Sequence, residues 1–128
     1  MNLIKHFVAV ALSVASVCAF SDTYYLDGND GMGKSSFADG ASSGVGAKWK
    51  IDGGEAIANY PVAGNEYIVK GHDLRTPDQN ASYTFAGDKL TLETENISAA
   101  SPTWGKLVNK HKGSKTLTIT NFWFKNGF

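Results

Sequence analysis

The chain has 128 residues, a formal net charge of zero and one cysteine, Cys18. This length is enough for one domain with a modest core, and the neutral charge argues against nucleic acid as a partner. Because Cys18 near the N-terminus is the only cysteine, the residues after it contain no disulfide and no cysteine-based metal site.

Residues 1–21 are predicted to be a secretory signal peptide. Lys5 and His6 form a short basic start, and the apolar run Phe7–Val17 that follows is bounded by small residues. The run is shorter than the ~20 residues of a membrane-spanning helix, so we expect cleavage rather than anchoring. The sequence therefore predicts a bacterial protein, secreted or on the cell surface, in which residues 22–128 form a β-rich repeat domain.

Charge is unevenly placed along this domain. Residues 22–95 hold all 12 acids of the chain, whereas residues 96–128 hold five lysines and no acid. The simplest interpretation is that these lysines solvate a loop, although they also suit contact with an acidic polysaccharide.

Short alternating runs dominate the chain, and their period of two predicts β-strands. The expected strands are Thr23–Leu26, Ala47–Ile51, Asn65–Val69, His72–Leu74, Tyr83–Phe85, Lys89–Glu93, Trp104–Val108, Thr116–Thr120 and Phe122–Phe124. A glycine-rich loop is expected over 27–46 and a single helical turn over 55–60, ended by Pro61. No apolar pattern of helical period is long enough for a stable helix, so the fold class is all-β.

The stretch Ser82–Glu95 places two alternating runs on either side of a Gly-Asp step. Looser forms of the same pattern occur at Tyr67–Leu74 and Leu117–Phe124, which predicts a stack of similar strand units. The chain ends on an aromatic strand without the polar cap that such stacks need, so we expect the domain to be incomplete at its C-terminal end. The alternative is a small antiparallel β-sandwich whose last strand is Thr116–Phe124.

The opening Tyr-Tyr-Leu-Asp-Gly-Asn-Asp and the patterns at Tyr67–Leu74 and Tyr83–Leu92 resemble the N-terminal region of bacterial secreted proteins of the autotransporter-passenger type. This resemblance implies a right-handed parallel β-helix segment with coils of roughly twenty residues, inward aliphatic side chains and Asn in the turns. Asn121, between two strand runs, suits such a turn. Any contact with the outer membrane would be made through a C-terminal region of a longer parent protein.

Two motifs suggest ligands but lack their structural context. Gly28–Ser35 has the spacing of a phosphate-binding P-loop, but the glycine-rich segment after it cannot form the required helix. Asp27, Asn29 and Asp30 are oxygen ligands of the kind that calcium takes, yet the EF-hand pattern fails beyond them. The sequence therefore predicts no nucleotide, no metal and no cofactor.

No constellation of catalytic residues is evident. Glu93 and Glu95 share a strand face near Asp88, but a solvated face explains such carboxylates more simply than a glycosidase pair does. His72 and His111 lie in polar turns without a nucleophile or metal partner at a supporting spacing. We predict no catalytic residues and no enzymatic activity.

Trp104 and Lys106 are the candidate carbohydrate-binding residues. Trp104 lies where an expected loop leads into an expected strand; its ring can stack on a sugar there, and Lys106 can meet an acidic group. The leading hypothesis is a non-catalytic, adhesin-like structural segment that contacts a glycan or another cell-surface ligand. The alternatives are a carbohydrate-binding β-sandwich and the N-terminal part of a β-helical polysaccharide-degrading enzyme, with catalytic residues beyond residue 128.

Overall fold

The computed structural model describes residues 22–38, 47–52, 54, 56–57, 60–77, 80–95, 103–109 and 113–126. The predicted signal peptide over residues 1–21 lies outside these ranges, and so does His111. All statements on the fold concern the described residues.

The described chain is all-β, as predicted, with strands and no helix. The strands are β1 (Thr23–Leu26), β2 (Trp49–Ile51), β3 (Ala56–Ile57), β4 (Glu66–Lys70), β5 (Asp73–Arg75), β6 (Tyr83–Thr84), β7 (Lys89–Glu95), β8 (Thr103–Trp104), β9 (Lys106–Val108), β10 (Leu117–Thr118) and β11 (Phe122–Lys125). Every strand expected from the period-two pattern is present in part or in full. The helical turn expected over 55–60 is wrong, because residues 56–57 form β3 instead.

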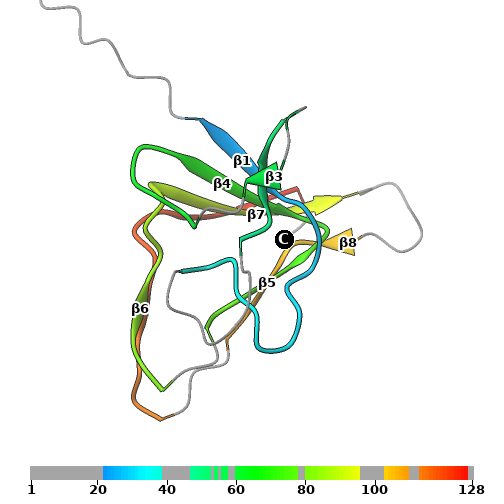
Figure 1. The fold of residues 1–128 in the computed structure, drawn as a ribbon. Coiled ribbons are helices and arrows are strands. Elements are labelled where there is room, and N and C mark those ends of the chain that lie inside the picture. The colour runs from blue at the N-terminus through cyan, green and yellow to red at the C-terminus, as the bar shows by residue number, and fades with distance from the viewer. Residues whose placement is uncertain are drawn as a thin grey trace, which may run out of the picture.

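Most strand pairs are parallel. The main sheet has the order β11-β7-β4-β1-β2-β3, in which β1, β4, β7 and β11 are parallel neighbours. Two further parallel pairs, β5 with β9 and β6 with β10, form separate two-stranded sheets. In Figure 1 the sheet with β1, β4 and β7 lies across the top, β6 runs down the left and β5 runs diagonally below, so the strands surround a core on three sides.

This pairing does not fit the alternative of an antiparallel sandwich. Antiparallel pairs occur where β2 joins β1 and β3, and where β8 joins β7. Elsewhere the chain passes through β4, β5 and β6 and then repeats the order with β7, β9 and β10, each beside its counterpart. Successive passes therefore stack in register.

The register corrects the repeat unit expected from the sequence. Tyr67 pairs with Leu90, and Leu90 pairs with Phe122, so equivalent units begin at β4, β7 and β11. The stretch Ser82–Glu95 is not one unit, because β6 pairs with β10 while β7 pairs with β4 and β11. Its Gly-Asp step turns a corner between two sheets.

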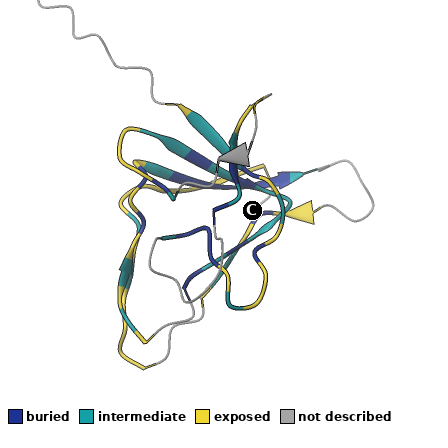
Figure 2. Cartoon of the chain, viewed as in Figure 1, coloured by how far each residue is buried: buried dark blue, intermediate teal, exposed yellow. Residues whose placement is uncertain are grey.

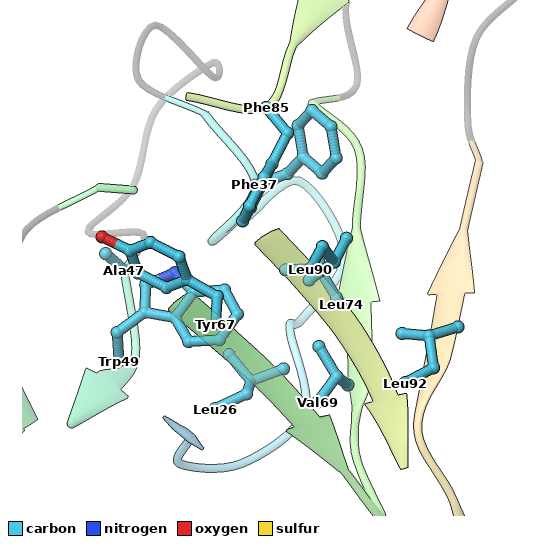
Figure 3. Packing of buried hydrophobic residues seen from close by; sticks show 10 residues of the cluster. All are labelled: Leu26, Phe37, Ala47, Trp49, Tyr67, Val69, Leu74, Phe85, Leu90 and Leu92. Atoms are coloured by element: carbon cyan, nitrogen blue, oxygen red, sulfur yellow. The ribbon is translucent and has the colours of Figure 1, made fainter. Parts of the chain in front are cut away.

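Tyr67 is at the centre of the core (Figure 3). Its ring stacks on Tyr24 at 5.3 Å between centroids and meets Trp49 and Phe85 edge-on at 4.9 and 5.4 Å. Its hydroxyl accepts a hydrogen bond from the Val62 amide at 3.0 Å. Such edge-to-face contacts add to the free energy of burial, so this cluster fixes the side chains between β1, β4 and β6.

Inward aliphatic side chains continue the core along β1, β4, β5 and β7. The fully or nearly fully buried members are Leu26, Val69, Leu74, Leu90 and Leu92. On β4 the buried residues alternate with half-buried ones, whereas Thr91, Glu93 and Thr94 of β7 are buried as well, so β7 is covered on both faces. Figure 2 shows buried residues on the strands of the main sheet and exposed residues on the loops and β8.

The glycine-rich segment after β1 is more ordered than the sequence suggests. Residues 27–38 contain no strand, as expected, but Ser35, Ser36 and Phe37 are completely buried. Phe37 packs on Phe85 with ring centroids 5.2 Å apart. The end of this segment is therefore part of the core, whereas Met32 and Lys34 before it are exposed.

Candidate functional site

Trp104 and Lys106, the predicted carbohydrate-binding residues, lie on two different sheets. Trp104 ends β8, opposite Thr94 of β7, and is 45 % exposed. Lys106 begins β9, beside Asp73 of β5, and its Nζ lies 3.7 Å from the Asp73 carboxylate. The exposed indole is available for stacking, whereas the ammonium group already has an acidic neighbour.

Gly105 separates the two residues. Its amide donates a hydrogen bond to the Glu93 carbonyl at 3.0 Å, and a Cβ at this position would overlap the carbonyl group of Val69. The backbone therefore approaches β4 and β7 closely enough that only glycine fits. This close approach ends β8 and directs β9 onto β5, which carries Lys106 away from the sheet of Trp104.

A hollow of about 410 Å³ with both polar and apolar lining lies where β6 leads into β7. It is lined by Thr84, Phe85, Ala86, Gly87, Asp88, Thr120 and Asn121. The Asn121 side-chain amide donates to the Asp88 carbonyl at 2.8 Å, and an Asp88 carboxylate oxygen accepts from the Gly64 amide at 2.9 Å. Hydroxyl, amide and carboxylate groups in an open hollow are suited to hydrogen bonding with hydroxyl-rich ligands.

Asn65, Asp88 and Asn121 occupy equivalent turn positions, each directly before a strand of the parallel sheet. Asn65 Oδ1 accepts from the Asp22 amide at 3.2 Å, so each of the three side chains bonds to the turn of the preceding pass. The placement of Asn121 in a turn agrees with the expectation from sequence. The sequence pattern does not predict such a position for Asn65 or Asp88, although Gly87-Asp88 is a step between two expected strands.

The outward face of β7 and β11 carries charge and an exposed ring. Trp123 is 57 % exposed, and the Lys89 Nζ lies 5.2 Å from the centroid of its ring. The Glu93 carboxylate lies 3.6 Å from Lys70 Nζ and 3.5 Å from Lys125 Nζ, with its side chain only 9 % exposed. Trp123 is thus a second exposed indole, in a sequence run from which only a strand had been predicted.

The segment that resembles a P-loop has a structural role. The Ser35 hydroxyl donates to the Arg75 carbonyl at 2.6 Å and accepts from the Phe37 amide at 3.1 Å. Because this hydroxyl is buried and bonded to backbone on both sides, it is not placed to bind a phosphate-bound magnesium ion. The motif instead joins the segment after β1 to β5.

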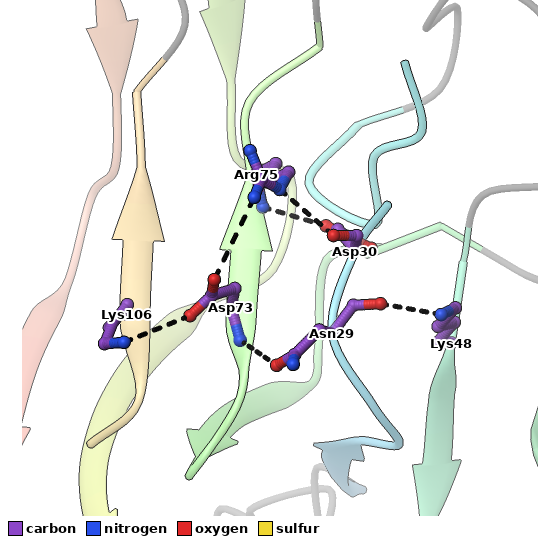
Figure 4. A network of polar contacts seen from close by, with 6 residues as sticks. All are labelled: Asn29, Asp30, Lys48, Asp73, Arg75 and Lys106. Atoms are coloured by element: carbon purple, nitrogen blue, oxygen red, sulfur yellow. Dashed lines mark hydrogen bonds and ion pairs between the residues drawn. The ribbon is translucent and has the colours of Figure 1, made fainter. Parts of the chain in front are cut away.

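Asp30 is the centre of a polar network that joins this segment to β5 (Figure 4). Its Oδ1 accepts from the Ser36 hydroxyl at 2.6 Å, and its Oδ2 accepts from the amides of Ser36 and Arg75 at 2.9 and 2.8 Å. The residue is only 3 % exposed. A buried carboxylate bonded to three donors stabilises the fold and leaves few lone pairs for a cation.

Asn29 and Asp73 extend the network on either side (Figure 4). Asn29 accepts from the Asp73 amide through Oδ1 at 2.8 Å and from Lys48 Nζ through its carbonyl at 2.7 Å. The Asp73 carboxylate faces Arg75 at 4.0 Å as well as Lys106. The side-chain oxygens of Asn29 and Asp30, two of the three residues that suggested calcium, therefore already accept hydrogen bonds from the protein.

The residues that suggested hydrolysis are not assembled into a site. Glu93 is paired with two lysines, and Asp88 bonds to a backbone amide. The His72 carbonyl accepts from the Lys106 amide. Within the described ranges no three His, Cys, Asp or Glu side chains are grouped so that they could hold a metal ion.

Two titratable groups have perturbed proton affinities. The Lys50 ammonium, 2.8 Å away, holds the pKa of Asp27 below its ordinary value of 3.8. Burial raises the pKa of Tyr24 above its ordinary value of 10.0, and the charge of Asp22 and the neighbouring Tyr67 raise it further. Neither change brings a group near neutral pH, as acid–base catalysis would require.

No helix in the described part of the chain has the length and apolar character needed to cross a membrane. The chain matches no family model, and comparisons with curated proteins and with solved structures give no match. The geometry of the strands, the turns and the two exposed indoles is therefore the basis for a functional proposal.

Proposed function

We propose that residues 22–128 form a segment of a right-handed parallel β-helix with a structural and adhesive role outside the cell. The single observation behind this proposal is the repeated parallel register of β4, β5 and β6 with β7, β9 and β10. A connection between parallel strands of one sheet is right-handed in nearly all proteins, which favours a right-handed coil from β4 to β7.

The adhesive part of the proposal is supported by where the described side chains are exposed. Trp104 and Trp123 present large rings to solvent, and both lie on or beside the parallel sheet. Rings of this kind stack on the apolar faces of sugars, and neighbouring lysines attract acidic groups. We propose a surface glycan, contacted by Trp104, as the ligand; Lys106 lies on another sheet beside Asp73 and is not part of this contact.

Binding of the purified chain to immobilised neutral, uronic-acid and sulfated polysaccharides tests this role. We expect Trp104→Ala to weaken binding about fivefold or more, since one aromatic contact contributes about 1 kcal/mol. Val62→Ala is the matched control, because Val62 is also an exposed apolar residue. Unchanged binding by a folded Trp104→Ala variant would exclude Trp104 as the platform.

Activity measurements on the same polysaccharides test the non-catalytic part. We expect no release of reducing ends and no unsaturated uronic acid, because no catalytic constellation is assembled in the described residues. Turnover that persists after repurification would overturn this part of the proposal and favour a polysaccharide-degrading enzyme.

Export through a cleaved signal peptide completes the proposal. It is supported by the apolar run and small residues near the N-terminus. The expected mature chain begins near Asp22, and mass spectrometry of material from the culture medium measures this directly. Exported material that retains Met1 would contradict cleavage.

A further inference from the structure

The two ends of the parallel sheet differ in how they are covered. Beyond β1, the sheet continues into β2 and β3, and Trp49 of β2 is completely buried with its Nε1 donating to the Ser36 carbonyl at 2.8 Å. At the other end β11 is the last described strand. The β11 edge is therefore the place where a further strand can be added to the described sheet.

Residues of β11 that continue the inward columns are exposed. Phe122 lies beside Leu90 and Phe124 beside Leu92, both of which are buried in the core. The two rings, with centroids 4.9 Å apart, are 38 % and 52 % exposed. An added strand with apolar residues at these two positions would cover rings that now face water.

The peptide groups of β11 point alternately toward β7 and toward the open edge of the sheet. The Leu90 amide donates to the Asn121 carbonyl, so alternate residues of β11 direct their peptide groups toward β7. The peptide groups of Phe122 consequently point toward the open edge. Edge strands of this kind bind extended peptides through main-chain hydrogen bonds.

The outward charges alternate from strand to strand. Lys70 of β4 pairs with Glu93 of β7, which pairs with Lys125 of β11. The Lys125 side chain remains 59 % exposed although it is paired with Glu93. Continuing the alternation places a carboxylate opposite Lys125 on an added strand.

We propose that the β11 edge binds an extended peptide strand of another polypeptide, parallel to β11, with apolar residues opposite Phe122 and Phe124 and a carboxylate opposite Lys125. The strand β7 shows that this pattern fits the sheet, since Leu90, Leu92 and Glu93 hold the same positions beside β11. The inference follows from strand register and charge and does not depend on glycan binding.

A second copy of this chain is a poorer occupant. The strand with the required pattern, β7, is already enclosed between β4 and β11 in each copy. Two β11 edges would also bring together strands whose charged residue is Lys125, with no acid in either strand. Opposite charge across the edge favours an acidic partner strand.

Fluorescence anisotropy with labelled peptides tests the proposal on the purified chain. The first peptide copies residues 87–95; the second has its leucines and threonines exchanged, and the third has lysine in place of the glutamate that corresponds to Glu93. We expect the exchanged peptide to bind at least about tenfold more weakly, because its apolar side chains face outward. The lysine peptide should bind about two- to fivefold more weakly than the first.

Charge reversal on the protein gives the matched test. Lys125→Glu should reverse the preference between the first and third peptides, whereas Lys115→Glu, an exposed lysine outside β11, should not. Circular dichroism and analytical ultracentrifugation check the fold and the oligomeric state of each variant. Equal binding of the first and exchanged peptides, failure of the first peptide to bind, or self-association that blocks it would each overturn the proposal.

Discussion

Asp30 shows how one buried carboxylate fixes a segment that lacks regular structure. Its two oxygens accept three hydrogen bonds, two of them from the backbone amides of Ser36 and Arg75. Hydrogen bonds to a charged acceptor are among the stronger ones in proteins. The segment after β1 is therefore held against β5 by acceptor geometry as well as by the burial of Phe37.

Substitution of Asp30 tests this conclusion. Asp30→Ala should lower the free energy of unfolding by about 2–4 kcal/mol, because it leaves the Ser36 and Arg75 amides without their acceptor. Asp30→Asn should cost roughly half as much, since its carbonyl oxygen can still accept both amides. Urea unfolding measures both values, with Asp52→Ala as a control at an exposed acid. Equal losses for Asn and Ala would show that charge, not acceptor geometry, is decisive.

The Asp27–Lys50 pair predicts a pH dependence with a definite sign. Lys50 lowers the pKa of Asp27 in the folded state, so the pair stabilises the fold above the ordinary pKa of 3.8. This stabilisation is lost as the pH falls through the lowered pKa of the folded state. Lys50→Met should therefore raise the pKa of Asp27 toward its ordinary value, as measured by NMR titration of the carboxyl group.

Lys48→Met is the matched control for this titration. Lys48 Nζ bonds to the Asn29 carbonyl and acts on Asp27 only at a distance, so its removal should raise the pKa of Asp27 less than Lys50→Met does. A larger effect of Lys48→Met would contradict the assignment of Lys50 as the main partner.

At the scale of elements, the turns before β4, β7 and β11 are each fixed by an Asn or Asp side chain. Asn121 acts as a donor to the Asp88 carbonyl, whereas Asp88 acts as an acceptor for the Gly64 amide. The two positions therefore differ in the chemistry that they require, although both bond to the preceding turn. Only a side chain with an amide group suits the first position.

Exchange of the two residue types tests this difference. Asn121→Asp should destabilise the chain by about 1 kcal/mol, because a carboxylate would then face the Asp88 carbonyl. Asp88→Asn should change the free energy of unfolding by less than about 0.5 kcal/mol, since an amide oxygen can still accept from Gly64. Thermal unfolding of the two variants is the measurement, and similar losses for both would contradict the assigned donor and acceptor roles.

Local pattern was sufficient to predict the strands other than β3, but not how they pair. The alternation of apolar and polar residues places β1, β4 and β7 within one or two residues of the expected bounds. Register is decided by contacts between residues far apart in sequence, so the equivalence of Tyr67 and Leu90 is not visible in either strand alone. Phe37 was missed as a core residue because glycines and serines surround it.

The candidate site shows the same limit. Trp104 and Lys106 are close in sequence and were predicted to act together, but the close approach of Gly105 to Val69 assigns them to different sheets. Trp123 was recognised only as part of a strand, since which residues of the strand face outward depends on its pairing with β7. Exposure is a property of the assembled sheet rather than of a short run of residues.

For the molecule as a whole, the stacking of parallel strands gives each strand a number of neighbours that depends on its place in the sheet. Strand β4 lies between β1 and β7, whereas β11 is paired only with β7 among the described strands. In stacked folds the stability of a unit depends largely on its nearest neighbours. The described sheet should therefore be most resistant to opening around β4 and β7 and least resistant at β11.

Amide hydrogen exchange measures this gradient. Amides of β11 should exchange at least about tenfold faster than those of β4, because an edge strand opens without breaking the pairing of the other strands. Within β11, the Phe122 amide, which points to the open edge, should exchange faster than the Trp123 amide, which faces β7. Addition of the peptide that copies residues 87–95 should slow the Phe122 amide and leave β4 unchanged. If β11 is already as protected as β4 in the purified chain, its edge is covered before any peptide is added, and the predicted gradient is wrong.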